Sequence, residues 1–166
     1  MVSILFSTHP ILPYFHLPSL SLGYNPAMSD FKFFHPVEVR YEDLDPQGHV
    51  NNAKHLTYFE QARIHYLMHL DLFNRASSFM EVGVIIADIH ITFHSPIQYR
   101  DPIKVGVRTA RIGGKSLTTE QCVMHAETGE IMASGTVVLV AYDYQKSKPI
   151  AVPEDWRKKI SEFEGI

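Results

Sequence analysis

The chain has 166 residues, of which 45% are hydrophobic and 20% charged, and this usage is typical of one globular domain. The net charge of −3 provides no basic surface for nucleic acid, which excludes that class of partner. Cys122 is the only cysteine, which excludes a disulfide framework and a thiolate zinc site. We therefore expect a cytoplasmic protein that binds neither nucleic acid nor a metal.

The N-terminal segment is the one compositional break in the chain. Its first 29 residues contain no Asp, Glu, Lys or Arg, and Pro10, Pro13 and Pro18 interrupt its apolar character. The segment therefore matches neither a secretory signal nor a membrane span. We predict a flexible, non-catalytic extension over residues 1–28 and a single domain over residues 29–166, with no membrane attachment.

The first predicted element of the domain is a strand, because residues 37–42 alternate between apolar and charged side chains. Pro46 lacks an N–H, so the chain is expected to leave the sheet directly after Asp45. Asn51 and Asn52 are both good N-cap residues for the helix that follows. The free N–H groups of that helix should lie near the Asp45 carboxylate, where they would stabilise a negatively charged oxygen.

The helix that follows is predicted to end near residue 72. A projection at about 100° per residue places five apolar residues on one stripe that should face the sheet: Leu56, Phe59, Tyr66, Leu67 and Leu70. Arg63 falls in this stripe and Glu60 at its edge, so we expect an i, i+3 ion pair that fixes the helix on the sheet. His65 and His69 have the spacing of a zinc pair, but they project away from the stripe and should be solvated.

The rest of the chain reads as strands, after a polar loop over residues 74–80. Four alternating stretches predict strands at about 89–93, 103–107, 117–124 and 131–142. Gly113-Gly114 and Thr128-Gly129 are expected hairpin turns. Pro153, followed by two acidic residues, predicts a short C-terminal helix. The fold class is therefore α+β, with about five antiparallel strands and one long helix.

Two segments carry a family resemblance: DPQGHVNNAKHLTYFEQAR, at residues 45–63, and ITFHSPIQYRDPIKV, at residues 91–105. The chain resembles the hotdog-fold thioesterases, in particular the 4-hydroxybenzoyl-CoA and acyl-CoA thioesterase branch. The resemblance implies a curved antiparallel sheet wrapped around one central helix. It also implies that Asp45 is the catalytic acid, that the backbone N–H of Asn52 polarises the thioester carbonyl, and that two subunits of a homodimer or homotetramer form each active site.

A second resemblance concerns the neighbours of Asp45. Plant acyl-ACP thioesterases have a D-x-N-x-H-V-N-N pattern, of which this chain keeps Asp45 and His49 but has Gln47 in place of the first asparagine. His49 is therefore a candidate auxiliary catalytic residue. The expected substrate-binding residues in or beside this motif are Gly48, Asn51 and Glu60.

Basic side chains over one predicted hairpin are candidates for binding the phosphates of CoA, and they could equally form a solvated face: Arg100, Lys104, Arg108, Arg111 and Lys115. Of these we select Arg111 and Lys115. We expect the hydrolysis of an acyl-CoA or aryl-CoA thioester without a cofactor, with Asp45 as general base or nucleophile. The alternatives are an acyl-ACP thioesterase and a hotdog module that binds acyl-CoA without hydrolysing it.

Overall fold

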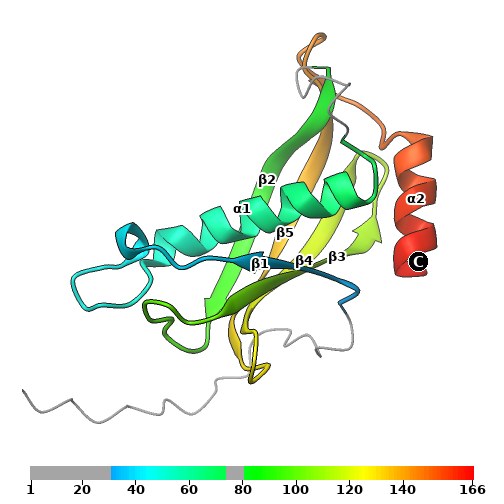
Figure 1. The fold of residues 1–166 in the computed structure, drawn as a ribbon. Helices are drawn as coiled ribbons and strands as arrows, with labels where there is room; N and C mark the ends of the chain where they lie inside the picture. Colours follow the sequence, from blue (N-terminus) through cyan, green and yellow to red (C-terminus); the bar gives the residue numbers. More distant parts are fainter. Residues whose placement is uncertain (1–30, 74–80) are drawn as a thin grey trace, which may run out of the picture.

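The computed structural model describes residues 31–73 and 81–166, which form an antiparallel sheet with one long helix lying across it (Figure 1). The predicted extension over residues 1–28 and the predicted loop 74–80 lie outside the described residues. The strands are β1 (Phe33–Val37), β2 (Val82–Phe93), β3 (Ile103–Ile112), β4 (Ser116–His125), β5 (Ile131–Asp143) and β6 (Lys148–Pro149). The helices are α1 (Asn52–His69) and α2 (Glu154–Glu164), and Tyr41–Asp43 forms a single 3-10 turn, η2.

The sheet has the strand order β1-β3-β4-β5-β2, and the short β6 pairs with β5. Every neighbouring pair is antiparallel, so β1 and β2 lie at its two edges. The predicted α+β class and the two hairpin turns are confirmed. The sheet has six strands in place of about five. The additional strand, β6, pairs with β5 over only two residues, which is too short for a pattern of alternating apolar and polar side chains.

The first strand lies earlier than predicted. β1 ends at Val37, which pairs with Ile103 at the very start of β3. Beyond that pair β3 offers no further partner, so the chain leaves the sheet and forms the η2 turn in place of the predicted strand over residues 37–42. The Asp43 carboxylate accepts the N–H of Arg40 at 2.9 Å and closes this turn.

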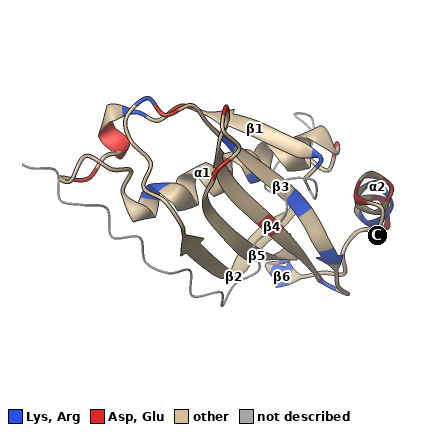
Figure 2. Cartoon of the chain, turned by 90° about the horizontal axis from the view of Figure 1, so that it is seen from below, with Lys and Arg blue, Asp and Glu red and all other residues tan. Residues whose placement is uncertain are grey.

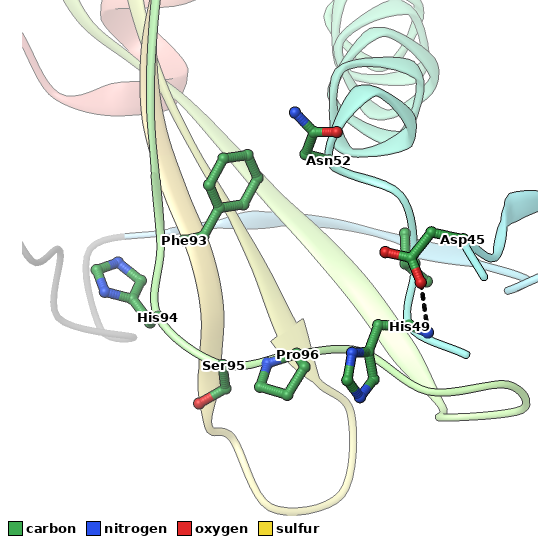
Figure 3. Close-up of a pocket in the computed structure, with 8 residues that line it drawn as sticks. Asp45, His49, Asn52, Phe93, His94, Ser95 and Pro96 are labelled. Atoms are coloured by element: carbon green, nitrogen blue, oxygen red, sulfur yellow. Dashed lines mark hydrogen bonds between the residues drawn. The ribbon is translucent and has the colours of Figure 1, made fainter. Parts of the chain in front are cut away.

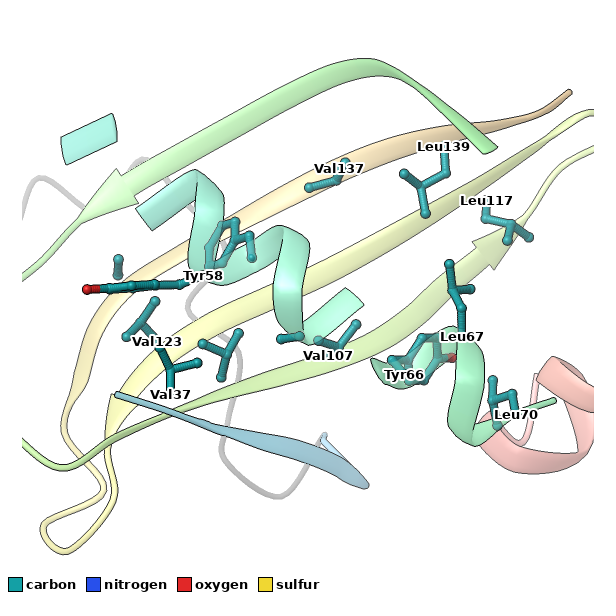
Figure 4. Close-up of a cluster of buried hydrophobic side chains, with 14 of the residues drawn as sticks. Val37, Tyr58, Tyr66, Leu67, Leu70, Val107, Leu117, Val123, Val137 and Leu139 are labelled. Carbon is teal, nitrogen blue, oxygen red and sulfur yellow. The ribbon is translucent and has the colours of Figure 1, made fainter. Parts of the chain in front are cut away.

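The core lies between α1 and the sheet. Figure 4 shows side chains of α1, including Tyr66 and Leu67, lying over apolar side chains of the sheet: Val107, Leu117, Val123, Val137 and Leu139. Each fully buried side chain of this size contributes about 1.5–3 kcal/mol to stability. The predicted apolar stripe is wrong at Leu56, which is 39% exposed, and correct at its other four positions.

The C-terminal end of α1 also differs from the prediction. The helix ends at His69, and Asp71 adopts a left-handed conformation with φ 52°. This turn directs Leu72 and Phe73 back into the core, where each is 7% exposed. The burial of these two side chains therefore requires the helix to stop before residue 72.

Two contacts bring α1 close to the sheet. Gly135 lies under Phe59: an added Cβ would stand 3.0 Å from the Phe59 ring and 2.4 Å from the carbonyl oxygen of His90. The buried Gln121 side chain donates from Nε2 to the carbonyl oxygen of Phe59 at 2.9 Å. These two contacts fix the distance between the N-terminal half of α1 and the sheet, and they therefore also fix the position of the start of the helix.

The predicted ion pair between Glu60 and Arg63 is not formed. Arg63 is 4% exposed, whereas Glu60 is exposed, and the described part of the chain contains no salt bridge between them. Burial lowers the pKa of the Arg63 guanidinium, and the charge of Glu60 only opposes that shift. The i, i+3 spacing permits the pair, but the sheet covers only the Arg63 side of the helix.

The second helix docks at the end of β3, opposite the loop that precedes α1 (Figure 1). The Glu164 carboxylate accepts the Tyr66 hydroxyl at 2.6 Å and the backbone N–H of Thr109 at 3.0 Å. Thr109 lies beyond the part of β3 that β1 covers, so Glu164 satisfies a donor at the sheet edge. Neither described helix combines the length and the apolar character needed to cross a membrane.

Candidate active site

A pocket of about 450 Å³ opens between the loop that precedes α1 and the chain at the end of β2 (Figure 3). Its lining consists of Asp45, His49, Val50, Asn52, Phe93, His94, Ser95 and Pro96. Backbone contacts tie the two walls together, since the N–H of Val50 donates to the carbonyl oxygen of Ile97 at 2.8 Å and His49 forms a β-bridge with Gln98. The pocket therefore has fixed walls, and it contains three of the residues selected from the sequence.

The Asp45 carboxylate is held by one of its two oxygens. Oδ1 accepts the backbone N–H of Gln47 at 2.9 Å and that of His49 at 3.2 Å. The turn is tight, and Gly48 has φ 84°, a conformation that L side chains rarely adopt. Among the described residues nothing donates a hydrogen bond to Oδ2, and Figure 3 shows this second oxygen directed toward the β2 side of the pocket. One oxygen positions the group, and the other is available to a ligand.

The start of α1 leaves one backbone donor free. Asn51 is the N-cap: its side-chain oxygen accepts the N–H of Ala53, and its carbonyl oxygen accepts the N–H of Lys54, both at 2.9 Å. The N–H of Asn52 has no hydrogen-bond acceptor in the described part of the chain. Asn52 and Asp45 line the same pocket, so a residue with a free N–H at the positive end of the helix dipole and a residue with a free carboxylate oxygen contribute to one site.

Asp43, the first acid of the D-L-D sequence, supports this loop from below. It is 5% exposed and accepts the Tyr58 hydroxyl at 2.9 Å and the Lys54 ammonium at 3.1 Å, besides the N–H of Arg40. Partial burial raises its pKa, but these donors outweigh that effect and the net shift is downward. Sequence reasoning missed this role, because nothing in the spacing pairs Asp43 with Tyr58.

The other residues expected in the motif lie around the pocket in different ways. His49 is partly buried and its ring projects toward Pro96 (Figure 3). Gly48 and Asn51 shape the turn and the helix start without lining the pocket. His94, which no motif in the sequence indicated, also lines the pocket, and its Nε2 lies 2.8 Å from the Ser134 hydroxyl.

Three predicted substrate-binding residues lie away from Asp45. Glu60 is exposed on α1. Arg111 and Lys115 stand at the far end of the β3–β4 hairpin, and Figure 2 shows basic residues spaced along β3 up to that end. From Ile103 to Arg111 the strand spans roughly 26 Å at about 3.3 Å per residue. Within one chain the structure does not bring these two cations to the pocket.

The histidines of α1 do not assemble a metal site in the described residues, where no group of three or more His, Cys, Asp or Glu side chains is placed to hold an ion. His65 is exposed and stacks on His35 with ring centroids 4.0 Å apart. His69 is also exposed and contacts the rings of Phe33 and Phe163. Both histidines thus project from the core as expected, but each makes a ring contact.

Comparison with known proteins identifies the family to which the chain belongs. A family model described as the thioesterase-like superfamily matches residues 39–160, which include every residue that lines the pocket. The chain belongs to this superfamily. The predicted assignment to the thioesterases is thereby confirmed.

Two bacterial relatives of this superfamily member illustrate the similarity. The acyl-CoA thioester hydrolase YbgC of Escherichia coli O6:H1 is 28% identical over 127 residues, which cover 76% of this chain and 94% of YbgC. The long-chain acyl-CoA thioesterase FadM of Escherichia coli K12 is 25% identical over 127 residues, which cover 76% of this chain and 96% of FadM.

Solved structures confirm the hotdog fold of this superfamily member. A thioesterase from Thermus thermophilus, crystallised with coenzyme A and Zn, superimposes with a TM-score of 0.72 at 37% identity and covers 84% of this chain and 99% of its own. The PA5185 protein of Pseudomonas aeruginosa PAO1 superimposes with a TM-score of 0.73 at 26% identity and covers 81% of this chain and 92% of its own.

Proposed function

We propose that this thioesterase hydrolyses acyl-CoA or aryl-CoA thioesters in the pocket between the Asp45 loop and the end of β2. The observation that carries the proposal is the presence, in one pocket, of a carboxylate oxygen and a helix N-terminal N–H that are both without hydrogen bonds in the described part of the chain. The acyl-CoA substrates named for YbgC and FadM, and the coenzyme A bound to the Thermus protein, support CoA as the carrier.

The two groups fit the two needs of thioester hydrolysis. In one route Asp45 takes a proton from a water molecule whose oxygen attacks the thioester carbon; in the other Asp45 attacks the carbon directly and forms an anhydride that water then hydrolyses. In both routes the carbonyl oxygen becomes negatively charged and accepts the N–H of Asn52, and collapse of the intermediate expels the CoA thiolate. A donor of this kind is worth about 100-fold to 1,000-fold in kcat.

We further propose that the chain forms a homodimer, or a tetramer of two such dimers, through the free edge of β2. One edge of β2 pairs with β5, and among the described strands none covers the other. Its side chains include Ile85, Ile86 and Ile89, which are 37–42% exposed. An unpaired edge that carries apolar side chains is a surface that proteins normally cover.

This dimer would also give the distant cations a role. Two β2 strands paired antiparallel around a twofold axis place the C-terminal end of one strand beside the N-terminal end of the other. The pocket lies at the C-terminal end of β2, and the β3–β4 turn lies at the opposite end of the sheet. The Arg111 and Lys115 side chains of one protomer would therefore approach the pocket of its partner and bind CoA phosphates there.

A thiol-release assay tests the proposal, run with acyl-CoAs of increasing chain length, an aryl-CoA and an acyl-ACP. We expect turnover of at least one CoA thioester in preference to the acyl-ACP. Release from the acyl-ACP alone would replace CoA by the protein carrier. Binding of acyl-CoA without release of thiol from any thioester would overturn hydrolysis and leave the non-catalytic binding module.

A further inference from the structure

Arg63 is a buried cation without a partner in the described part of the chain. The residue is 4% exposed, and none of the ion pairs or hydrogen bonds found among the described residues involves its guanidinium. The guanidinium remains charged, and a buried charge is unfavourable unless an acceptor pairs with it. The described polar atoms that are fully enclosed and unpaired belong to His35, His55 and Gln121, so the Arg63 nitrogens still reach the surface. An acceptor from another molecule can therefore bind them.

Glu60 is an acid without a partner on the same side of α1. Its side chain is exposed, and it forms no ion pair or hydrogen bond with any described residue. His65 marks the side of the helix that faces β1, because its ring stacks on that of His35. At about 100° per residue, Glu60 and Arg63 lie roughly 140° and 160° around the helix from His65. Both side chains therefore belong to the side of α1 that faces the β2 edge of the sheet.

We propose that Arg63 binds the Glu60 carboxylate of a second copy of the chain, and that Glu60 binds the Arg63 guanidinium of that copy. The inference rests on the dimer proposed above, in which two β2 strands pair around a twofold axis. A twofold interface brings the same surface of each copy together, so a contact between two different residues occurs twice. Both residues lie near the middle of α1, and the β2-facing sides of the two helices face each other across the axis. Each buried cation then has an acid from the other copy.

The surroundings favour this pairing over a water-filled gap. Leu56 precedes Glu60 by four residues, lies on the same side of the helix and is 39% exposed. Ile86 and Ile89 of β2 are 42% and 37% exposed. In the dimer these apolar side chains would surround the two ion pairs and exclude water, which strengthens the attraction between the charges. The same arrangement makes the interface selective, because a copy without the matching charge leaves Arg63 buried and unpaired.

An exchange of the two charges tests the pairing. Glu60→Lys should weaken the dimer because the introduced lysine faces Arg63 of the second copy, and Arg63→Glu should weaken it because two glutamates then face each other. A mixture of the two variants should dimerise again, since one chain of each kind makes both contacts complementary. Sedimentation velocity measures the dimer, and native mass spectrometry of the mixture identifies the heterodimer. A pair formed within one chain could not be restored by mixing.

Neutral variants test the pairing without burying a new charge. We expect Glu60→Gln and Arg63→Gln each to raise the dimer dissociation constant by about 30-fold or more. The double variant should raise it by about as much as the larger of the two single changes, because both remove the same contact. Glu162→Gln is the matched control, since it removes an exposed carboxylate that pairs with Lys158 within α2, and it should leave the dissociation constant unchanged.

The same measurements can overturn the pairing. An unchanged dissociation constant in Glu60→Gln, or a mixture that forms no heterodimer, would do so. A dimer weakened by Arg63→Gln but not by Glu60→Gln would assign the guanidinium to another acceptor, such as a bound carboxylate, and would also overturn it. A monomeric wild-type protein would overturn both the pairing and the dimer, whereas thiol release from acyl-CoA thioesters, measured separately, would still test the proposed hydrolysis.

Discussion

The loop that precedes α1 contains two aspartates, Asp43 and Asp45, whose carboxylates lie in different surroundings. Asp43, on the underside, accepts hydrogen bonds from a backbone N–H, a tyrosine hydroxyl and a lysine ammonium. Asp45, two residues later, faces the pocket and keeps one oxygen without a donor among the described residues. The comparison shows that a carboxylate whose oxygens all accept hydrogen bonds from the protein has a structural role. A carboxylate that keeps one oxygen free can react with a ligand.

The largest effect should come from Asp45→Asn. The amide keeps the shape of the side chain and can still accept the two turn N–H groups, but it is neither a base nor a nucleophile. We expect thiol release to fall about 1,000-fold, with the thermal midpoint within a few degrees of the wild type. Asp71→Asn, at an exposed aspartate paired with Lys159, is the matched control and should be fully active. Undiminished turnover in Asp45→Asn would exclude Asp45 from the chemistry.

The second prediction removes the free helix donor and leaves the helix intact. Asn52 is the first helical residue, a position where proline is well tolerated, and Asn51 before it has the extended ψ of 137° that a following proline needs. Asn52→Pro should therefore lower kcat about 100-fold with an unchanged far-UV circular dichroism spectrum.

Asn52→Ala is the control for that experiment, because it removes the side chain and keeps the N–H. It should retain activity near that of the wild type. If the alanine variant loses as much as the proline variant, the side chain of Asn52 matters and its backbone donor does not.

These predictions depend on a site that the sequence indicated only in part. The proximity of Asp45 to the start of α1 followed from a strand end, a proline and an N-cap pair, and the structure places Asp45 and Asn52 in one pocket. The donors to Asp43 and the burial of His55 depend on how α1 sits on the sheet, which no local pattern records. The i, i+3 spacing allowed a Glu60–Arg63 ion pair, but the orientation of the helix leaves Glu60 exposed and buries Arg63.

The strands also differ in how far the local sequence pattern predicts them. β3, β4 and β5 were expected near their observed positions because one face of each packs under α1 and the other does not, which produces alternation. β2 begins at Val82, well before the predicted start at residue 89, because its sequence VGVIIADIHITF has little alternation. The early end of β1 is set by the start of β3, which lies 66 residues further along the chain than Val37.

The third prediction tests the hydrogen bonds that Asp43 accepts beneath the Asp45 loop. In Asp43→Asn the amide oxygen can still accept the Arg40 N–H and the Tyr58 hydroxyl, which both donate to Oδ2, but the amide NH2 then replaces the Oδ1 oxygen that accepts the Lys54 ammonium. We expect a loss of about 2 kcal/mol in the free energy of unfolding, measured by urea denaturation. Tyr58→Phe removes only one of the donors and should cost about 1 kcal/mol. A fully stable Asp43→Asn protein would show that the network does not support the loop.

The fourth prediction concerns acid stability. His55 has a pKa of about 4 in the folded protein and about 6.5 when unfolded, so the unfolded chain binds more protons between these values. Stability should therefore be fully present above about pH 6.5 and should fall by up to about 3 kcal/mol as the pH drops to about 4. Burial and the neighbouring His65 also lower the pKa of His35, which adds a loss of the same sign.

The difference between the wild type and His55→Phe isolates the contribution of His55, because the loss from His35 is common to both. Urea denaturation at several pH values between 4 and 7.5 should give a flatter profile for the variant. Parallel profiles would mean that His55 is protonated in the folded protein as readily as in the unfolded chain.

The smallest effect should come from His49→Ala. His49 holds Asp45 through its backbone N–H at 3.2 Å, and the alanine variant keeps that N–H, the turn and the β-bridge to Gln98. The imidazole itself makes no hydrogen bond to Asp45 in the described structure, so its removal should lower kcat less than about tenfold, by altering only how water or substrate is oriented in the pocket. Thiol release compared directly with Asp45→Asn measures the ratio. A loss as large as that of Asp45→Asn would make His49 a catalytic partner of the acid and would favour the arrangement that the D-x-N-x-H-V-N-N pattern of the acyl-ACP thioesterases implies.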